Sequence, residues 1–268
     1  VNATAFSALR ADDTTVLDRA DCPVLQVALA GHKRAAWDSS PRGLSATDLA
    51  MNVVLPELDG RLFTRAISFK AEMPFDADLE YATQVHEPAE DRIAYVADLA
   101  AAWVRLRERP RAERRLAIML SDYPGRGGRT GYACGLDTPE SASAILDVLK
   151  AADYSVGDKL PSGAQIIAAL SGLAPSGTLT VRVADYRQWL AALPASVGES
   201  VIAQWGEPEQ DPACSDGCFR FRCVRAGQVV IVLQPDRGTA GDRKSGYHDT
   251  SVPPRHAYVA LYAALRAQ

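Results

Sequence analysis

The 268-residue sequence has no long apolar segment, only four histidines and little net charge. No apolar run approaches the about 20 residues that a helix needs to span a bilayer, so no membrane segment is expected. The formal net charge of −4 lacks the basic excess that is typical of nucleic-acid-binding proteins. Hydrophobic residues make up 47% and charged residues 23%, which is ordinary for a soluble globular protein.

The N-terminus lacks the basic and apolar regions of a signal peptide, so we expect a cytoplasmic protein. A starting Met is also missing, which indicates that the chain has been trimmed or excised from a longer one.

Cysteines are few, and their odd number argues against a disulfide framework. They are Cys22, Cys134, Cys214, Cys218 and Cys223. The last three follow a Cys-x3-Cys-x4-Cys pattern, but a zinc site usually needs a fourth ligand, which is not apparent. Ordinary reduced cysteines are the favoured interpretation, and a metal or redox role stays open.

A nucleotide-binding motif is absent as well. The glycine-rich segment 123–131 lacks the Gly-x4-Gly-Lys-Ser/Thr pattern, so the chain is expected to bind neither ATP nor GTP tightly. Glycine N–H groups and the side chains of Arg126 and Arg129 suit another kind of anion. A flexible connection is the alternative.

Strand and helix patterns alternate, which predicts an α/β protein. Strands are expected at 24–30, 62–69, 116–120, 179–183, 219–224 and 228–233, and helices at 49–55, 91–109, 140–152, 162–170, 186–193, 201–205 and 257–265. Pro56 is expected to end the first helix. The prediction is two Rossmann/flavodoxin-like lobes with mostly parallel sheets, at 1–110 and 111–268, with a long connecting helix in the first and a β-hairpin in the second.

The segment Gln234–His256 is the richest candidate site. It lies between the apolar strand 229–233 and the helix 257–265, and loops at the carboxyl ends of strands commonly bind ligands in α/β proteins. Its polar side chains are Asp236, Arg237, Asp242, Lys244, His248, Asp249 and His256. Imidazole can bind a borderline cation or accept a proton, although a structural hydrogen-bonding role is the alternative.

A pair of carboxylates in Pro-Glu-Leu-Asp-Gly forms a second candidate. Glu57 and Asp59 could bind a hard cation or accept protons, with Arg65 as a charge partner. Ordinary turn chemistry at Asp-Gly is the alternative.

Three long segments carry a family resemblance. Residues 43–70, 115–131 and 234–256 resemble, in the same order, the large tetrapyrrole-binding subunits of ATP-dependent cobaltochelatases and magnesium chelatases. The positions shared with both branches are Gln234, Gly238, Gly241, Asp242, Pro254 and His256. Those resembling the cobalt branch are Asp236, Arg237, Lys244, Tyr247 and His248.

The resemblance implies part of a metal–nitrogen ligase of cobalamin biosynthesis. Its parent binds hydrogenobyrinic acid a,c-diamide and inserts Co²⁺ as substrate, while AAA+ partner subunits use ATP and Mg²⁺. His248 and His256 are then candidate metal and catalytic residues, and Glu57 a catalytic one. The candidate macrocycle-binding residues are Arg65, Arg126, Arg129, Arg237, Asp242 and Lys244.

The sequence departs from this family in one respect. It stops at Gln268, before the His-Gly-x-Leu-Glu-Trp-type motif of full-length subunits, so the isolated chain is expected to be an inactive internal fragment. Two alternatives remain: a non-catalytic ligand-binding α/β module, and a relative of the magnesium chelatase large chain.

Overall fold

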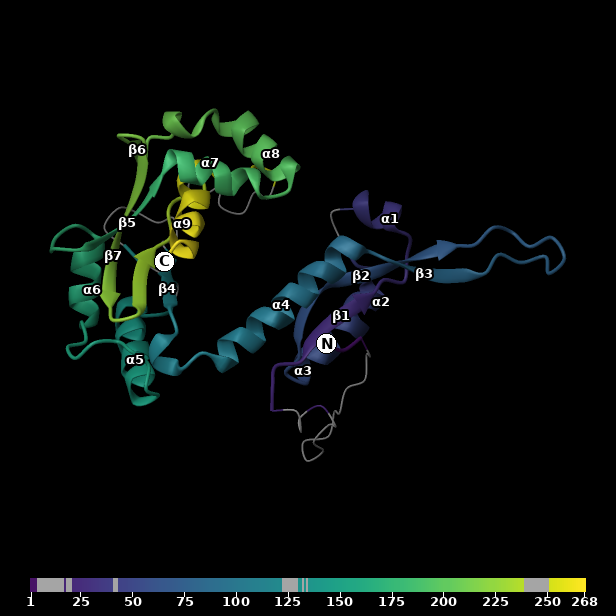
Figure 1. The fold of residues 1–268 in the computed structure, drawn as a ribbon, viewed down its shortest axis with the longest axis horizontal. Coiled ribbons are helices and arrows are strands. Elements are labelled where there is room, and N and C mark those ends of the chain that lie inside the picture. The colour runs from purple at the N-terminus through teal and green to yellow at the C-terminus, as the bar shows by residue number, and fades with distance from the viewer. Residues whose placement is uncertain are drawn as a thin grey trace. The chain divides into compact units, whose positions relative to one another are not determined.

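The computed structural model describes residues 1–3, 17, 21–40, 43–121, 130–131, 133, 135–238 and 251–268. They divide into two compact units, Val1–Glu108 and Arg109–Gln268 (Figure 1). The sequence analysis predicted lobes at 1–110 and 111–268. Each unit contains its own sheet, which confirms an α/β fold with two sheets.

The first unit is built on a three-stranded sheet of order β1-β2-β3. Its strands are β1 (Leu25–Leu29), β2 (Leu62–Glu72) and β3 (Gln84–Pro88). β1 and β2 run parallel, as expected, whereas β2 and β3 are antiparallel. All five side chains of β3 are exposed, so no apolar alternation marked this strand in the sequence.

A continuous helical stretch joins the first two strands. It consists of α2 (Ala46–Leu49), the π-helical turn η2 (Ala50–Val54) and α3 (Leu55–Leu58). The prediction that Pro56 ends this helix was wrong, because Pro56 lies in the first turn of α3. We infer that the wide π turn before it accommodates the missing N–H and the bulk of the proline ring. The other helices of this unit are α1 (Arg34–Asp38) and α4 (Glu90–Glu108).

The second unit has a mixed sheet of order β4-β8-β7-β5, with β6 paired to β7. Its strands are β4 (Leu116–Leu120), β5 (Gly177–Arg182), β6 (Cys214–Ser215), β7 (Cys218–Ala226) and β8 (Val229–Leu233). Within this second sheet, the β4–β8 pair is parallel and the other strand pairs of the described residues are antiparallel. The expectation of mostly parallel sheets therefore does not hold, since the hairpin and the pairing of β5 to β7 make most neighbours antiparallel.

Helices cover both faces of this sheet. They are α5 (Thr138–Ala151), α6 (Gly163–Leu170), α7 (Val183–Ala191), α8 (Ala195–Trp205) and α9 (His256–Arg266), with short 3₁₀ turns η3 (Arg111–Glu113) and η4 (Pro208–Gln210). Val230 and Val232 of β8 pack in a core with α7 and α9, and Val229 and Ile231 pack in another with α5 and α6. Burial on both faces explains the unbroken apolar run of β8.

The expected hairpin between β7 and β8 is confirmed. Its turn contains Gly227, which has a φ of +56° and lies against the backbone of Ser155. Within the described part of the chain, no helix combines the length and the apolar character needed to cross a membrane.

Candidate functional site

Two candidate loops leave the second sheet at the same edge. β4 and β8 are adjacent and parallel, with Leu120 beside Leu233, so both strands end together. The pairing continues one step further, because the backbone N–H of Gln234 donates to the carbonyl oxygen of Leu120 at 3.0 Å. The glycine-rich segment 123–131 follows β4 and the Gln234–His256 segment follows β8. Parallel neighbours therefore place Ser121 and Gln234, the residues that directly follow the two strands, at one carboxyl edge, where α/β sheets bind ligands.

The end of the glycine-rich segment returns to this edge. Gly131 has a φ of +73°, and a Cβ placed on it would lie 3.8 Å from a methyl carbon of Leu233. Its carbonyl oxygen accepts a hydrogen bond from the buried Thr138 hydroxyl at the start of α5. Glycine is favoured here by the left-handed backbone, and a Cβ would also lie 3.3 Å from the hydroxyl oxygen of Thr138.

Hydrogen bonds organise the two ends of the Gln234–His256 segment. The side-chain amide of Gln234 donates to the hydroxyl oxygens of Tyr258 and Tyr262, at 2.6 and 2.9 Å. Arg237 donates from Nη2 to the carbonyl oxygen of Val252 at 2.8 Å, and the N–H of Arg255 donates back to the Arg237 carbonyl at 2.8 Å. These hydrogen bonds connect the two ends of the segment, which together form the loop base. The side chains of Gln234 and Arg237 are fixed there.

A buried ion pair anchors the returning end of this segment. Arg255 donates through Nε and Nη2 to the two carboxylate oxygens of Asp211, whose exposed fraction is 5%. The same carboxylate accepts from the backbone N–H groups of Ala213 and Ala257, at 2.9 and 3.2 Å. Burial alone would raise the pKa of Asp211, but the hydrogen bonds from Arg255 and Ala213 outweigh it and hold that pKa below its ordinary value.

His256 is fully buried at the first turn of α9, with both ring nitrogens in hydrogen bonds. Its Nε2 lies 2.9 Å from the carbonyl oxygen of Gly206, which can only accept, so Nε2 is the donor. Nδ1 then accepts from the Tyr186 hydroxyl at 2.9 Å. Burial, followed by the nearby Asp211 carboxylate, raises the pKa of Tyr186 well above its usual value, so this hydroxyl stays protonated. In this arrangement neither nitrogen of His256 has a lone pair for a metal.

The remaining residues suggested for this site lie outside the described part of the chain. They are Arg126, Arg129, Gly241, Asp242, Lys244, Tyr247, His248 and Asp249.

In the first unit, Glu57 is an exposed carboxylate on α3. Arg65 does not pair with it in the described structure, because its guanidinium carbon stacks 3.4 Å from the ring centroid of Tyr95. Asp59 instead lies 3.3 Å from Arg61, and both side chains are nearly buried. The Asp59 carboxylate is therefore paired with Arg61, while Glu57 keeps an exposed carboxylate.

The three clustered cysteines, Cys214, Cys218 and Cys223, lie within the described part of the chain. No group of three or more His, Cys, Asp or Glu side chains has a metal-binding arrangement among the residues described. Burial raises the pKa of the thiols of Cys214 and Cys223. Raised pKa values keep these thiols protonated, which disfavours both metal binding and nucleophilic reactivity.

Sequence reasoning missed the side chains that support the loop base. Tyr186, Trp205 and Asp211 all contact residues 253–257, with Trp205 donating from Nε1 to the carbonyl oxygen of Pro253 at 2.8 Å. Each of these residues lies more than forty positions from the residue to which it is hydrogen-bonded, so no local pattern links them. The only local signal was the spacing of Tyr258 and Tyr262, which places two hydroxyl groups on one face of a helix.

Comparison with known proteins gives a consistent assignment. A family model described as CobN/Magnesium Chelatase matches residues 1–268. The aerobic cobaltochelatase subunit CobN of Sinorhizobium sp is 41% identical over 279 residues, which cover 100% of this chain and 22% of that protein. A magnesium-chelatase subunit of Rhodobacter capsulatus is 27% identical over 246 residues, covering 86% of this chain and 20% of that protein.

A solved structure is also similar. The catalytic subunit of cobaltochelatase from Mycobacterium tuberculosis superposes with a TM-score of 0.76 at 36% identity, covering 92% of this chain and 21% of that one. The chain therefore spans about a fifth of the length of these relatives. Because the family model matches the whole sequence and the fold agrees, the chain belongs to the CobN/magnesium chelatase family.

Proposed function

We propose that this chain is part of the large subunit of a cytoplasmic ATP-dependent cobaltochelatase, and that it helps to bind hydrogenobyrinic acid a,c-diamide for Co²⁺ insertion. The observation that carries this proposal is that the parallel strands β4 and β8 end together at Leu120 and Leu233, with Gly131 close to Leu233. Residues 115–131 and 234–256 are also two of the segments in which the sequence resembles the family. Relatives at 41% and 39% identity are named as cobaltochelatase subunits.

The residue types in these two segments are suited to a macrocycle with carboxylate arms. In this proposal Arg126, Arg129, Arg237 and Lys244 bind those arms, and Asp242 orients neighbouring donors. His248 contacts the Co²⁺ substrate or accepts a pyrrole proton, since imidazole suits both tasks near neutral pH. His256 acts indirectly, because its two hydrogen bonds hold the end of the segment rather than a metal.

In the first unit, Glu57 is proposed as a proton acceptor and Arg65 as a contact of the macrocycle. Support for Glu57 is its exposed carboxylate beside a π turn, a feature that is frequent at functional sites. Support for Arg65 is weaker, because its guanidinium already stacks on Tyr95.

ATP hydrolysis is assigned to AAA+ partner subunits that bind ATP and Mg²⁺. The reason is the sequence of the glycine-rich segment, which lacks the Lys-Ser/Thr pair that binds phosphates and Mg²⁺ in nucleotide-binding loops.

The proposal is tested by cobalt insertion with the protein at its full natural length, its partner ATPase subunits, ATP, Co²⁺ and the macrocycle. His248→Ala should lower the insertion rate about 10²-fold or more, because a metal contact or proton acceptor is lost. His86→Ala is the matched control: it removes an exposed histidine of β3 and should leave the rate unchanged. A normal rate for folded His248→Ala would remove this residue from the mechanism.

A part of a magnesium chelatase is the second candidate. It is favoured by the relationship to the Rhodobacter capsulatus protein, but the 27% identity to that protein is well below the 41% to CobN. Insertion assays with Mg²⁺ in place of Co²⁺ separate the two candidates.

A further inference from the structure

Three uncharged side chains meet at the carboxyl end of β8: Gln234, Tyr258 and Tyr262. Gln234 follows β8 directly, and its side-chain amide lies 2.6 Å from the Tyr258 hydroxyl oxygen and 2.9 Å from that of Tyr262. The two tyrosines are four positions apart on α9, so both rings lie on one face of that helix, with centroids 5.7 Å apart. We call these three residues the Gln234 triad.

The direction of these hydrogen bonds determines what the hydroxyl groups can still do. An amide N–H can only donate, so each phenolic oxygen accepts from Gln234 and directs its own proton elsewhere. Within the described part of the chain, no residue accepts the proton of Tyr262. This tyrosine is half-buried, and its hydroxyl lies beside the residue whose backbone N–H donates to Leu120. Its O–H is therefore a donor at the carboxyl edge of β4 and β8.

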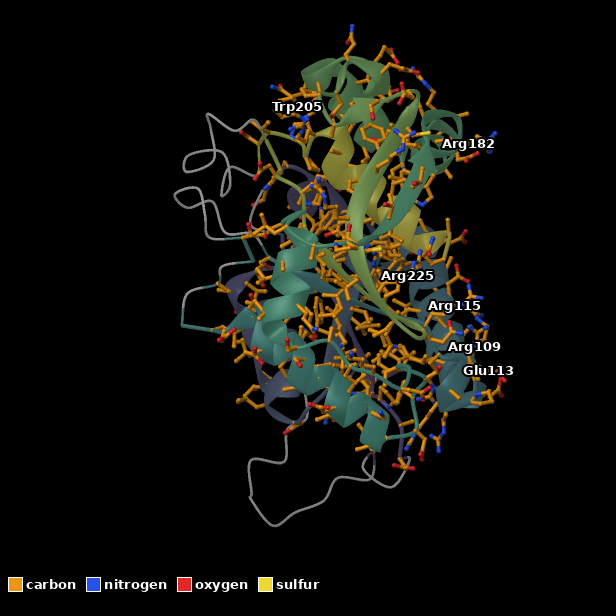
Figure 2. The ribbon with its side chains drawn as sticks, turned by 90° about the vertical axis from the view of Figure 1, so that its left-hand side faces the viewer. Arg109, Glu113, Arg115, Arg182, Trp205 and Arg225 are labelled. Carbon is orange, nitrogen blue, oxygen red and sulfur yellow. The ribbon has the colours of Figure 1, made fainter. Side chains whose placement is uncertain are left out.

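A simpler role for Gln234 is to attach α9 to the end of the sheet. The start of this helix is already attached by other residues. Trp205, labelled in Figure 2, donates to the carbonyl oxygen of Pro253 at 2.8 Å. Asp211 accepts from the backbone N–H of Ala257 at 3.2 Å. Attachment alone therefore does not explain why the Gln234 amide orients two hydroxyl groups.

The Gln234 triad carries no formal charge, which favours an uncharged ligand group. After accepting from Gln234, the oxygen of Tyr262 keeps one O–H to donate and one lone pair to accept. A carboxamide offers the matching pair, an oxygen that accepts and an N–H that donates, whereas a carboxylate only accepts. A carboxylate removed from water would also need a cation, which the triad does not supply.

We propose that Tyr262 donates a hydrogen bond to the carbonyl oxygen of a carboxamide arm of the macrocycle, and that Gln234 positions Tyr262 for this contact. The inference rests on the proposed function, which assigns macrocycle binding to this edge. It adds a determinant of specificity: arginine and lysine side chains bind the carboxylate arms, and the Gln234 triad binds an amide arm.

The test is absorption titration of the protein at its full natural length with two macrocycles. One is hydrogenobyrinic acid a,c-diamide, and the other is the same macrocycle with both amides replaced by carboxylates. Tyr262→Phe keeps the ring and removes only the hydroxyl, so the variant should fold. It should weaken binding of the diamide about tenfold, because an amide oxygen loses its donor, and should leave binding of the unamidated macrocycle nearly unchanged.

Gln234→Glu tests the positioning role. An ionised carboxylate only accepts, so both tyrosines would donate to it, and the proton of Tyr262 would no longer reach the ligand. Binding of the diamide should weaken about tenfold, although the attachment of α9 and the melting temperature are preserved. In the double variant with Tyr262→Phe the two losses should not add, since both changes remove the same donor.

Two control variants should bind both macrocycles normally. Arg220→Gln changes the charge of the second unit by the same amount as Gln234→Glu, and Arg220 is exposed on β7 near Ser215 and Asp216. Tyr81→Phe removes an exposed hydroxyl of the first unit.

Equal affinity of folded Tyr262→Phe and the unmodified protein for the diamide would overturn this inference and leave the proposed function intact. An equal loss for both macrocycles, or additive losses in the double variant, would also overturn it. If the unmodified protein binds neither macrocycle saturably, the proposed function fails and this inference fails with it.

Discussion

At the scale of single residues, His256 shows how environment decides the role of a side chain. Its sequence neighbours suggested a metal ligand, but Tyr186 and Gly206 occupy both ring nitrogens in a fully buried site. Such a histidine connects α9 to two segments far away in the sequence. Its contribution to chelation would come through the position of the preceding segment.

Tyr186→Phe should destabilise the second unit by about 1–3 kcal/mol, because it leaves the buried Nδ1 of His256 without a donor. The free energy of unfolding, measured with denaturant, checks this. Tyr95→Phe is the control, since Tyr95 contacts Arg65 through its ring and lies in the first unit. Equal stability of Tyr186→Phe and the unmodified protein would show that the hydrogen bond is dispensable.

Asp211 predicts a pH dependence of stability. Its folded pKa lies below that of an unfolded aspartate, about 3.9, so its contribution is fully present above that pH. It is lost as the pH falls through the lower folded pKa. Asp211→Asn should therefore cost about 1.5–3 kcal/mol at neutral pH, and the difference should shrink in acid.

Thermal melting of both proteins between neutral and acid pH measures this effect. A stability difference that stays constant across the whole range would contradict the assignment of the ionised pair with Arg255.

At the scale of elements, the β7–β8 hairpin depends on one glycine. A Cβ at Gly227 would lie 2.7 Å from the carbonyl carbon of Ser155, and its φ of +56° disfavours other residues. Gly217 has a similar φ of +66°, but nothing lies within 4 Å of a Cβ there. Gly227→Ala should therefore lower the free energy of unfolding clearly more than Gly217→Ala does. For Gly217→Ala the loss should be about 1–2 kcal/mol, from the backbone conformation alone.

Chemical denaturation of the two variants provides the comparison. Equal losses of unfolding free energy would mean that the backbone near Ser155 shifts to make room for the added methyl group.

The elements that could be predicted are those with strong local patterns. β4 was expected at the residues where it occurs, and the apolar run of β8 was recognised because both of its faces are buried. β3 was not predicted because its exposed side chains follow no apolar pattern. Pro56 was wrongly predicted to end the helix, because the π turn before it accommodates the proline. At the candidate site, the Gln234–His256 segment could be recognised from the strand before it and the helix after it. The pairs Tyr186–His256 and Asp211–Arg255 could not be predicted, because they join positions far apart in the sequence.

At the scale of the whole molecule, the sequence lacks the Gly-x4-Gly-Lys-Ser/Thr motif of nucleotide-binding loops. Calorimetry with ATP at physiological Mg²⁺ should detect no micromolar binding to this chain. Micromolar affinity would contradict the assignment of ATP hydrolysis to partner subunits alone.

The central claim is that the edge formed by β4 and β8 binds a corrin precursor. It is tested most directly by titrating the protein at its full natural length with hydrogenobyrinic acid a,c-diamide and with a porphyrin, followed by absorption spectroscopy. The account predicts saturable binding of the corrin precursor, weaker binding of the porphyrin, and at least about a tenfold loss of corrin affinity in Lys244→Gln. The control Arg220→Gln should bind normally. Preference for the porphyrin, or unchanged corrin affinity in folded Lys244→Gln, would contradict the account.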